Sequence, residues 1–512
     1  MVSIPTVVVE ADWGRTGLYD HAQSNITADV LALSTERGRD YASQLIGRSV
    51  AGKASIDLVN TTGKYSRSNA AGALYGVLDA GVLVRVRVTA PAAATLWTGF
   101  LSLVEASSGE MVPGEARVAR LTAVGPLARL RALGTVNVVP QTTILTGDAL
   151  ALVLDAAGWS ATARRLDAGQ TELPRWWVEK LNALSASADL EETERGFLSE
   201  GADGAIVYED RHHRLKTTHL TSQATFSDAP GATLPYTRFI PRDTDAEIFN
   251  TAVIPVRHFT TQALAVLWTY RGDTLTIAAG ASLELWTEYP GASVPDGRYV
   301  DAWTTPVVGT DITQTGVADG DLAVVADKFS QSMKITITNN HATAVATLTL
   351  VQARGTAVTE DEPTIVKSED TASSDPDTGY GERTVPRVGA WHQSLELTQA
   401  IADFMVSRYS APLTPIPIGL SYEATRSAAL MTEALTRNLS DHITVVANDA
   451  DGVALGVSGD YYVEAIRISI TKSRTRMDVF YDLSPVSGDG GYWAIGEVGY
   501  SELGETTRLA PP

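Results

Sequence analysis

The chain has 512 residues, a formal net charge of −20 and no cysteine. Its length allows about three or four domains, at roughly 100–200 residues each. The acidic balance argues against general nucleic-acid binding and against docking on an anionic membrane. The lack of cysteine excludes disulfides, thiolate metal sites and a cysteine nucleophile. We expect no membrane span and no secretory leader, because the sequence has neither an apolar run of about 18 residues nor a basic N-terminal region.

Residues 1–135 are dominated by the alternation that is typical of half-buried strands. The clearest example sets four valines against two arginines: Val82, Val84, Val86 and Val88 alternate with Arg85 and Arg87. A period of two places the valines on one face of a strand and the arginines on the other. We predict a β-rich domain over 1–135 and take the valine face as part of its wall.

The next segment changes to helical spacing. One set of apolar residues is Leu150, Val153 and Leu154, and a second is Val178, Leu181, Leu184 and Ala188. Each set falls on one face of a helix, and Gly158 and Gly196 follow the two sets as stop signals. We predict a small helical domain over 136–200, followed by a β segment over 201–262.

The second half of the chain returns to strands in two blocks. Residues 263–358 contain short strands separated by turn signals, a spacing that favours an inserted β-sandwich. Residues 359–385 are rich in acidic, serine, threonine and proline residues and are predicted to be an exposed linker. Residues 386–512 carry an amphipathic helix over 395–409 and then further strands. The predicted fold class is mainly β with a small helical domain (α+β).

The segment from Glu209 to His219 contains residue types that can bind a metal. His212, His213 and His219 lie near two acidic residues. In a strand, however, adjacent histidines point to opposite faces, so a solvated polar strand is the favoured interpretation. The glycine-rich stretch at 488–496 lacks the lysine of a phosphate loop and is interpreted as a flexible turn.

The familiar catalytic patterns are missing from this sequence. It has no G-x-S-x-G and no H-E-x-x-H motif, and no acidic stretch has the order of a calcium-binding loop. We therefore expect no catalytic, cofactor-binding or metal-binding residue, no cofactor and no enzymatic activity. Sugar binding by the inserted sandwich stays open. The chain has ten tryptophans, whose rings can stack on sugars, but tryptophans more often fill cores and interfaces.

The order of short motifs in the first hundred residues resembles that of bacteriophage tail-tip (baseplate) hub proteins. A loop of the form N-x-x-G-x-Y-S-x-x-N precedes a Leu-Tyr-Gly element, a G-x-x-V-R-V strand and an L-W-x-G strand. The matching residues are Asn60, Gly63, Tyr65, Ser66, Asn69, Leu74, Tyr75, Gly76, Gly81, Val84, Arg85, Val86, Leu96, Trp97 and Gly99. Further resemblance lies in 197–214, 380–386, 395–409 and the C-terminal 492–509.

This resemblance implies a structural virion protein at the tip of a phage tail, assembled in the host cytoplasm. It implies two β-barrel-like tube domains per chain, over 1–135 and 386–512, with 201–262 belonging to the hub body. Three chains would form a pseudo-hexameric ring at the end of the tail tube, and DNA would pass its lumen without specific binding during genome ejection. The implied partners are the tail tube protein, the tape-measure protein and tip fibre or receptor-binding proteins.

The interface residues of such a ring are not marked by the sequence. Our candidates are Val82, Val84, Val86 and Val88, the wall of the first tube domain. The alternative function is a host-surface carbohydrate-binding or adhesion module centred on 263–358. A cell-wall hydrolase is a third possibility that no zinc or paired-carboxylate motif supports.

Overall fold

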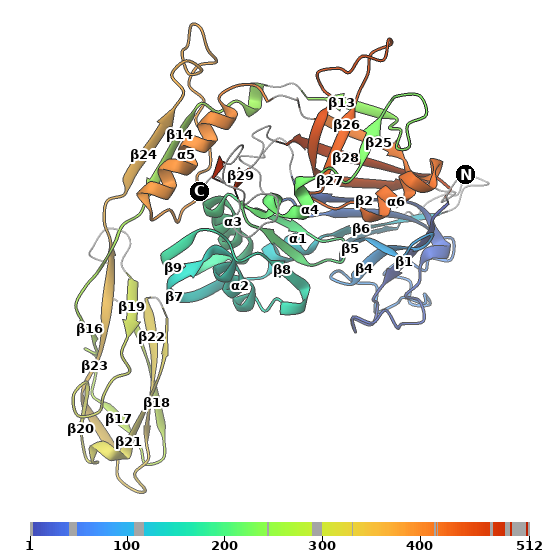
Figure 1. Cartoon of the computed structure of the whole chain (residues 1–512). Coiled ribbons are helices and arrows are strands. Elements are labelled where there is room, and N and C mark those ends of the chain that lie inside the picture. Colours follow the sequence, from blue (N-terminus) through green and yellow to red (C-terminus); the bar gives the residue numbers. More distant parts are fainter. Residues whose placement is uncertain are drawn as a thin grey trace.

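In the computed structural model of the chain, the described residues are 4–39, 49–106, 117–242, 245–288, 299–329, 331–413, 416, 418–471, 475–486, 492–493 and 508–509. Strands make up 44% and helices 17% of the structure, so the mainly β fold class is confirmed. A large sheet, a helical region beside it and a long projecting arm form the molecule (Figure 1). No helix among the described residues is long and apolar enough to cross a membrane.

Six N-terminal strands form one half of the large sheet. They are β1 (Thr6–Ala11), β2 (Val30–Gly38), β3 (Lys53–Val59), β4 (Leu83–Ala90), β5 (Ala94–Ala106) and β6 (Val118–Val124). All neighbours are antiparallel, in the order β1-β4-β5-β6-β3-β2. The alternation seen in the sequence explains β4, whose valines face the core while Arg85 and Arg87 bind Glu10 on the opposite face.

Six later strands form the other half. They are β12 (Thr225–Ser227), β13 (Arg238–Pro241), β25 (Ile418–Glu423), β26 (His442–Val446), β27 (Gly459–Ile470) and β28 (Met477–Pro485). Pairing of β2 with β27 joins the halves into one 12-stranded sheet. The described strands close no barrel. The two predicted barrel-like domains are therefore two halves of one open sheet.

A single apolar core covers one face of both halves. It joins the inward residues of the sheet to the loop between β3 and β4, through Tyr65 and Leu74, and to α6 (Ala428–Thr436), through Leu430 and Met431. The opposite face carries serines and charged side chains. The two faces thus differ as expected for an antiparallel sheet that is covered on one side only.

The segment predicted to be a helical domain is a mixture of helices and strands. Its elements are α1 (Pro126–Ala132), β7 (Thr135–Leu145), α2 (Thr146–Ala156), β8 (Arg164–Leu166), β9 (Glu172–Asn182), α3 (Ala183–Glu194), β10 (Phe197–Glu200) and β11 (Ile206–Glu209). The second predicted helix is wrong over Val178 and Leu181, which lie in β9. The aromatic and β-branched run before them favours a strand, and Asn182 caps α3 by accepting from the Leu184 amide.

The arm is inserted between β13 and β25. At its base, β14 (Thr251–Val256) pairs with β24 (Thr364–Glu369), and α5 (Leu395–Tyr409) packs on both. Further out lie β15 (Phe259–Thr261), β16 (Ala265–Thr269), β17 (Leu275–Ile277), β18 (Ser282–Glu288), β19 (Tyr299–Trp303), β20 (Ile312–Thr315), β21 (Leu322–Lys328), β22 (Ser332–Asn339) and β23 (Ala346–Glu360). β24 lies inside the stretch predicted to be a linker, so that stretch is only in part a loop.

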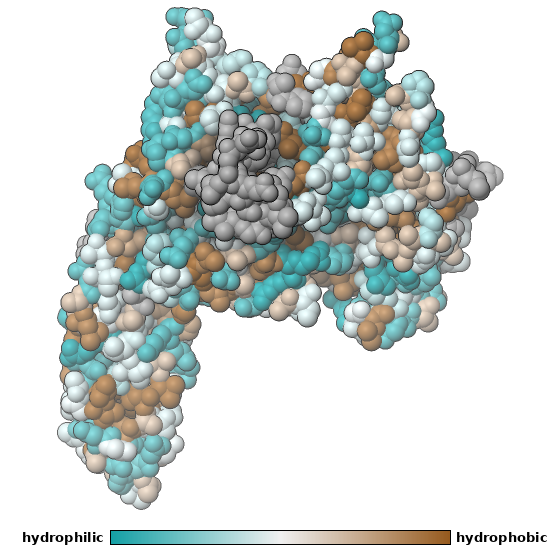
Figure 2. All heavy atoms as spheres, viewed as in Figure 1, coloured by the Kyte–Doolittle hydropathy of each residue, from teal (hydrophilic) through white to brown (hydrophobic). Residues whose placement is uncertain are grey.

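The remaining elements are short. They are α4 (Thr217–Leu220), β29 (Tyr492–Trp493), β30 (Arg508–Leu509) and the 3-10 helices Thr27–Asp29, Ala161–Ala163, His213–Leu215, Asp245–Glu247, Asp319–Asp321 and Ala424–Arg426. The glycine-rich stretch at 488–496 and the C-terminal motif at 492–509 lie almost wholly outside the described residues. On the face shown in Figure 2, hydrophobic residues are scattered in separate groups over the arm.

Candidate functional site

The two halves of the large sheet have the same spatial strand order, and five of the six strands run in matching directions. The first strand differs, since β1 runs antiparallel to β4 whereas β12 runs parallel to β26. When the six strands of each half are numbered in chain order, both halves have the spatial order 1-4-5-6-3-2. Only the second half carries a long insertion, the arm, between its second and third strands. The sheet is therefore built from two related six-stranded units that share five strands in order and direction. We call them unit 1 (β1–β6) and unit 2 (β12, β13 and β25–β28).

The likeness extends to irregular features of the fifth strand. In β5 the register with β6 shifts between Leu101 and Leu103, and in β27 the register with β28 shifts between Val463 and Ala465. Both units therefore have a bulge at the same place in the fifth strand. A bulge bends the strand and changes the direction of the side chains that follow it, so the shared position supports the relation between the units.

The residues before the two bulges also make the same backbone bonds. Leu101 binds Gly81 and Val82, as Val463 binds Ser440 and Asp441. Gly81 and Ser440 both have positive φ, 82° and 62°. These matched bonds fix a residue-by-residue alignment between the two units.

The junction between the units is a close contact of β2 with β27. Their register runs from Leu33 opposite Ile470 to Gly38 opposite Ala465. Gly38 has φ 134°, and a Cβ at this position would lie 2.4 Å from the Cα of Ala465. Only glycine allows this approach of the two backbones.

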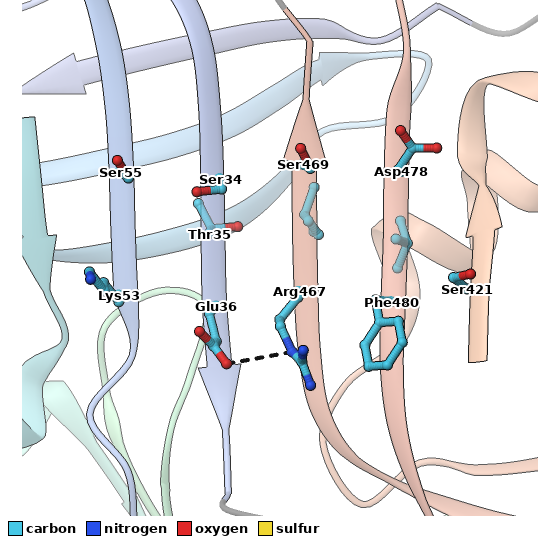
Figure 3. A pocket seen from close by; sticks show the side chains of 12 residues that line it. Ser34, Thr35, Glu36, Lys53, Ser55, Ser421, Arg467, Ser469, Asp478 and Phe480 are labelled. Atoms are coloured by element: carbon cyan, nitrogen blue, oxygen red, sulfur yellow. Dashed lines mark ion pairs between the residues drawn. The ribbon is translucent and has the colours of Figure 1, made fainter. Parts of the chain in front are cut away.

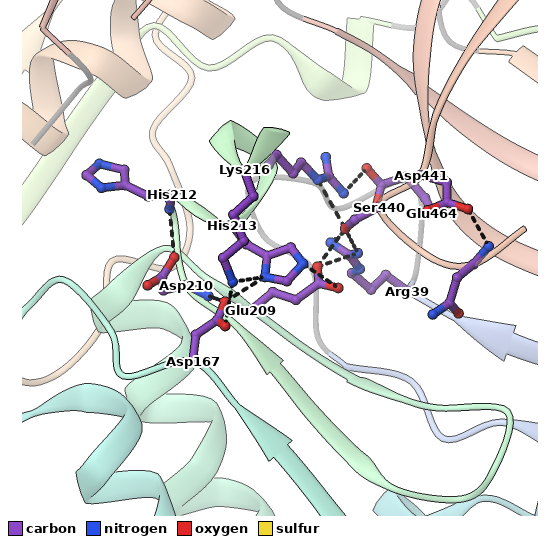
Figure 4. A network of polar contacts seen from close by, with 12 residues as sticks. Arg39, Asp167, Glu209, Asp210, His212, His213, Lys216, Ser440, Asp441 and Glu464 are labelled. Carbon is purple, nitrogen blue, oxygen red and sulfur yellow. Dashed lines mark hydrogen bonds and ion pairs between the residues drawn. The ribbon is translucent and has the colours of Figure 1, made fainter. Parts of the chain in front are cut away.

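A buried polar network ties the junction to the helical region (Figure 4). Arg39 contacts Glu209 and Glu464, each at 3.4 Å, and donates to the Ser440 hydroxyl at 2.8 Å. Ser440 donates to Glu209 at 2.6 Å, and Arg214 binds Glu464 at 2.7 Å. Buried charged groups are stable only when they have such partners. The network therefore holds three parts of the chain together, namely residue 39, residues 209–214 and residues 440–464.

The histidines singled out in the sequence border this network. The polar strand predicted for them is wrong, since His213 starts a 3-10 helix and His219 lies in α4. His213 contacts Asp167 at 2.6 Å, and its ring centroid lies 5.0 Å from that of His219, with the ring planes tilted by 38°. Burial lowers the pKa of His219. Among the described residues, no group of three or more histidine or acidic side chains is arranged to hold a metal ion.

A buried carboxyl group beside the junction predicts a pH dependence of stability. Burial raises the pKa of Glu191 to about 8, while Glu191 accepts from the Leu198 amide and the Ser49 hydroxyl. A raised pKa means that the folded chain binds the extra proton, so this group's stabilisation declines as pH rises from about 4.5 to about 8. We expect Glu191→Gln to flatten the fall in melting temperature between pH 5 and pH 8. An unchanged pH profile in the variant would contradict this assignment.

The candidate interface valines lie inside the core of unit 1. Val82, Val84 and Val86 have no exposed surface and Val88 has 1%. They form the inner layer of the wall, and direct contact of these side chains with another copy stays a prediction.

The polar face of the sheet is hollowed where the two units meet (Figure 3). Serines and charged residues from five strands line this hollow, including Ser34, Ser55, Ser469, Arg467 and Asp478. Several acidic and basic groups on this face form ion pairs. The pairs are Glu10 with Arg85 and Arg87, Asp57 with Arg120, Glu36 and Asp482 with Arg467, and Asp478 with Arg476.

Strand edges without a partner strand remain in the described sheet at β1, β12, β13 and the end of β5, and the last two matter for assembly. β4 accompanies β5 only as far as Phe100, so the stretch from Ser102 to Ala106 is bare on that side. Leu103, in this stretch, is 48% exposed and lines a small hollow with Tyr65 and Leu78. β13 pairs only with β25. Bare edges are sites at which another chain can add a strand.

The resemblance implied two related domains per chain, but the strand pattern by itself marked neither the duplication nor these edges. Unit 2 is interrupted by the arm, and its first two strands have only three and four residues. The one available signal was the similar alternation in β3 to β6 and in β25 to β28. Partners such as Arg39 and Glu464 are too far apart in sequence for their pairing to be inferred without a structure.

No protein-family model and no curated protein matches the chain. Solved structures with similar folds include the 43 kDa tail protein of prophage MuSo2 from Shewanella oneidensis, at 9% identity and TM-score 0.46, over 95% of this chain and 97% of that chain. A tail protein from Neisseria meningitidis has 8% identity and TM-score 0.46, over 94% and 96%. A type VI secretion component of E. coli has 8% identity and TM-score 0.38, over 90% and 74%. Two phage tail proteins and a secretion-system component are thus among the solved structures to which this chain is similar.

Proposed function

We propose that this chain is a structural protein of a phage tail tip, a hub that forms a trimeric ring at the end of the tail tube. The observation that carries the proposal is the duplicated six-stranded unit. Three copies of a chain with two such units supply six equivalent wall segments, which match a six-fold tube. Head-to-tail contacts that repeat give a closed ring when the rotation between neighbouring copies closes. The proposed role is architectural and involves no catalytic turnover.

The polar face of the sheet is the face we assign to the lumen. The apolar face is already covered by α6 and the β3–β4 loop, and the hollow across the junction indicates that the sheet is concave on its polar side. Several acidic side chains on this face are paired with arginines despite the net charge of −20. Such a wall has neither the basic footprint that binds DNA nor a strong repulsive field, so it suits passage without specific binding.

The arm gives the ring a place for partners. It extends away from the large sheet in Figure 1 and begins between two strands of unit 2. We assign tip fibre or receptor-binding proteins to the arm, and the tail tube and tape-measure proteins to the two rims of the ring.

Native mass measurement of the purified chain tests the proposal. We expect a species of three times the chain mass of 54.4 kDa, with its fraction rising as concentration increases. A chain that stays monomeric at every concentration tested, and also in the presence of the tail tube protein, would contradict it.

The alternative, a carbohydrate-binding module, is favoured by one feature of the arm. Trp286 is 57% exposed in β18 and stacks on Phe329 at 5.8 Å between ring centroids, with the planes 21° apart. The Trp303 indole donates to the Phe329 carbonyl, so this aromatic pair is held in place. Lys334, opposite Trp286, forms an ion pair with Glu284 and supplies polar groups beside the rings.

We expect Trp286→Ala to remove any saccharide binding by the arm, because an exposed ring is the surface on which a pyranose stacks. Saturation-transfer NMR of the full chain with a panel of methyl pyranosides measures this. Trp286→Tyr is the matched control and should retain part of the signal. No signal from any sugar with the unmodified chain would leave the arm without a carbohydrate role.

A further inference from the structure

The junction between the units shows how one unit joins the next. Within the chain, the second strand of unit 1 (β2) lies on the bare part of the fifth strand of unit 2 (β27). The corresponding partners for the next contact are the second strand of unit 2 (β13) and the fifth strand of unit 1 (β5), and both have an edge that no described strand covers. We infer that β13 of one copy pairs with the end of β5 of the next copy. This inference rests on the proposed function, since it specifies how the ring closes.

The alignment of the two units fixes the register of this pairing. In each unit, a row of paired residues runs across four neighbouring strands. It starts on the second strand and ends at the residue before the bulge of the fifth strand. In unit 1 the row is Thr35, Ala54, Ala123 and Leu101, and in unit 2 it is Pro241, Ile418, Leu483 and Val463. Thr35 and Pro241 therefore hold the same place in their units.

Counting onward from the bulge aligns the fifth strands. Ala106 matches Ile468, and Glu105 matches Arg467. The junction pairs within the chain are Thr35 with Ile468 and Glu36 with Arg467. The matching pairs between copies are Pro241 with Ala106 and Arg242 with Glu105.

The charges at the contact between copies are complementary, as they are at the junction within the chain, but the acidic and basic residues have exchanged strands. In the chain, the Glu36 carboxylate lies 3.5 Å from the Arg467 guanidinium. Between copies, arginine stands on the second strand and glutamate on the fifth. Arg242 reaches across Gly419 of β25 and binds Asp482 of β28 at 2.6 Å, and Arg467 binds the same carboxylate. In the single chain its guanidinium therefore lies over the sheet, and pairing with Glu105 requires it to turn to the free β13 edge. Opposite charges facing each other fix register and exclude a shifted pairing.

Side chains at the end of β5 are more exposed than their counterparts on β27, as expected if the β5 edge is covered only when a second copy binds. Leu103 is 48% exposed, whereas Ala465, its counterpart in the completed junction, is 4% exposed. A second copy would cover Leu103 and the small hollow beside it. Pro241 has no backbone donor, so the contact has fewer possible backbone bonds than the junction and depends more on side chains.

Disulfide trapping tests the register, because the chain has no cysteine of its own. We expect Ala106→Cys with Pro241→Cys to give covalently linked dimers and trimers on oxidation. The matched control combines Ala106→Cys with Arg238→Cys, which lies about 10 Å further along the strand and should not cross-link. A trimer by native mass without cross-links in the first variant would overturn the pairing and leave the proposed function standing. A chain that never trimerises would refute both.

Charge reversal gives a second, independent readout of the same contact. We expect Glu105→Arg and Arg242→Glu each to raise the concentration needed for half-assembly by about tenfold or more, because like charges then face each other. The double reversal should restore assembly to near the original level. Equal defects in the double variant and the single variants would contradict the pairing.

Discussion

Val84→Asp is expected to prevent the folding of unit 1, and not only its assembly. Val84 has no exposed surface and faces Ala11 on β1 and Gly99 on β5. A carboxylate there has no partner in the core, and burying it costs about 5 kcal/mol or more. That cost approaches the total stability of a typical domain. Circular dichroism during thermal unfolding and the yield of soluble chain measure the effect.

Leu103→Asp is the matched control for this experiment. Leu103 lies on the same β-rich unit but is largely exposed at the bare edge of β5. We expect this variant to fold with a normal melting temperature and to assemble poorly. A Val84→Asp chain that unfolds at the temperature of the unmodified chain would show that this face is not buried.

Arg39→Met should cost about 3–5 kcal/mol in the free energy of unfolding. The arginine lies between the buried carboxylates of Glu209 and Glu464, and its removal leaves both with less positive charge nearby. Chemical denaturation measures the loss.

The control for Arg39 is an exposed ion pair of the same kind. Arg120→Met removes the partner of Asp57 on the polar face and should hardly change stability, because exposed ion pairs contribute little. Equal effects of the two substitutions would mean that the Arg39 network does not hold the junction together.

Local structure was predictable where one face of an element is buried and the other is wet. The valine–arginine alternation of β4 and the face of α5 are of this kind, because burial on one side imposes a period on the sequence. In β9 the periodicity was ambiguous. Val178, Leu181 and Leu184 fit a helical face, yet the strand ends at Asn182 and the helix starts only after it.

Long-range organisation was not predictable from one sequence. The pairing of β2 with β27 and the nearby Arg39–Ser440 hydrogen bond both join residues that are more than 400 positions apart in the sequence. Equivalent positions in the two units share backbone geometry but not residue type. Thr35 corresponds to Pro241, and Glu105 to Arg467. The two units share backbone hydrogen bonds and a bulge, but not residue types. A duplication of this kind leaves no repeat in the amino-acid sequence.

Cryo-electron microscopy of the assembled chain tests the central claim most directly. The account predicts a closed ring of three copies, with six wall segments around one lumen, the polar face of the sheet inside and three arms outside. Density in which β13 adds to β5 of the neighbouring copy would establish the closing contact. An assembly with another stoichiometry, or a ring whose lumen is lined by the covered apolar side of the sheet, would contradict the account.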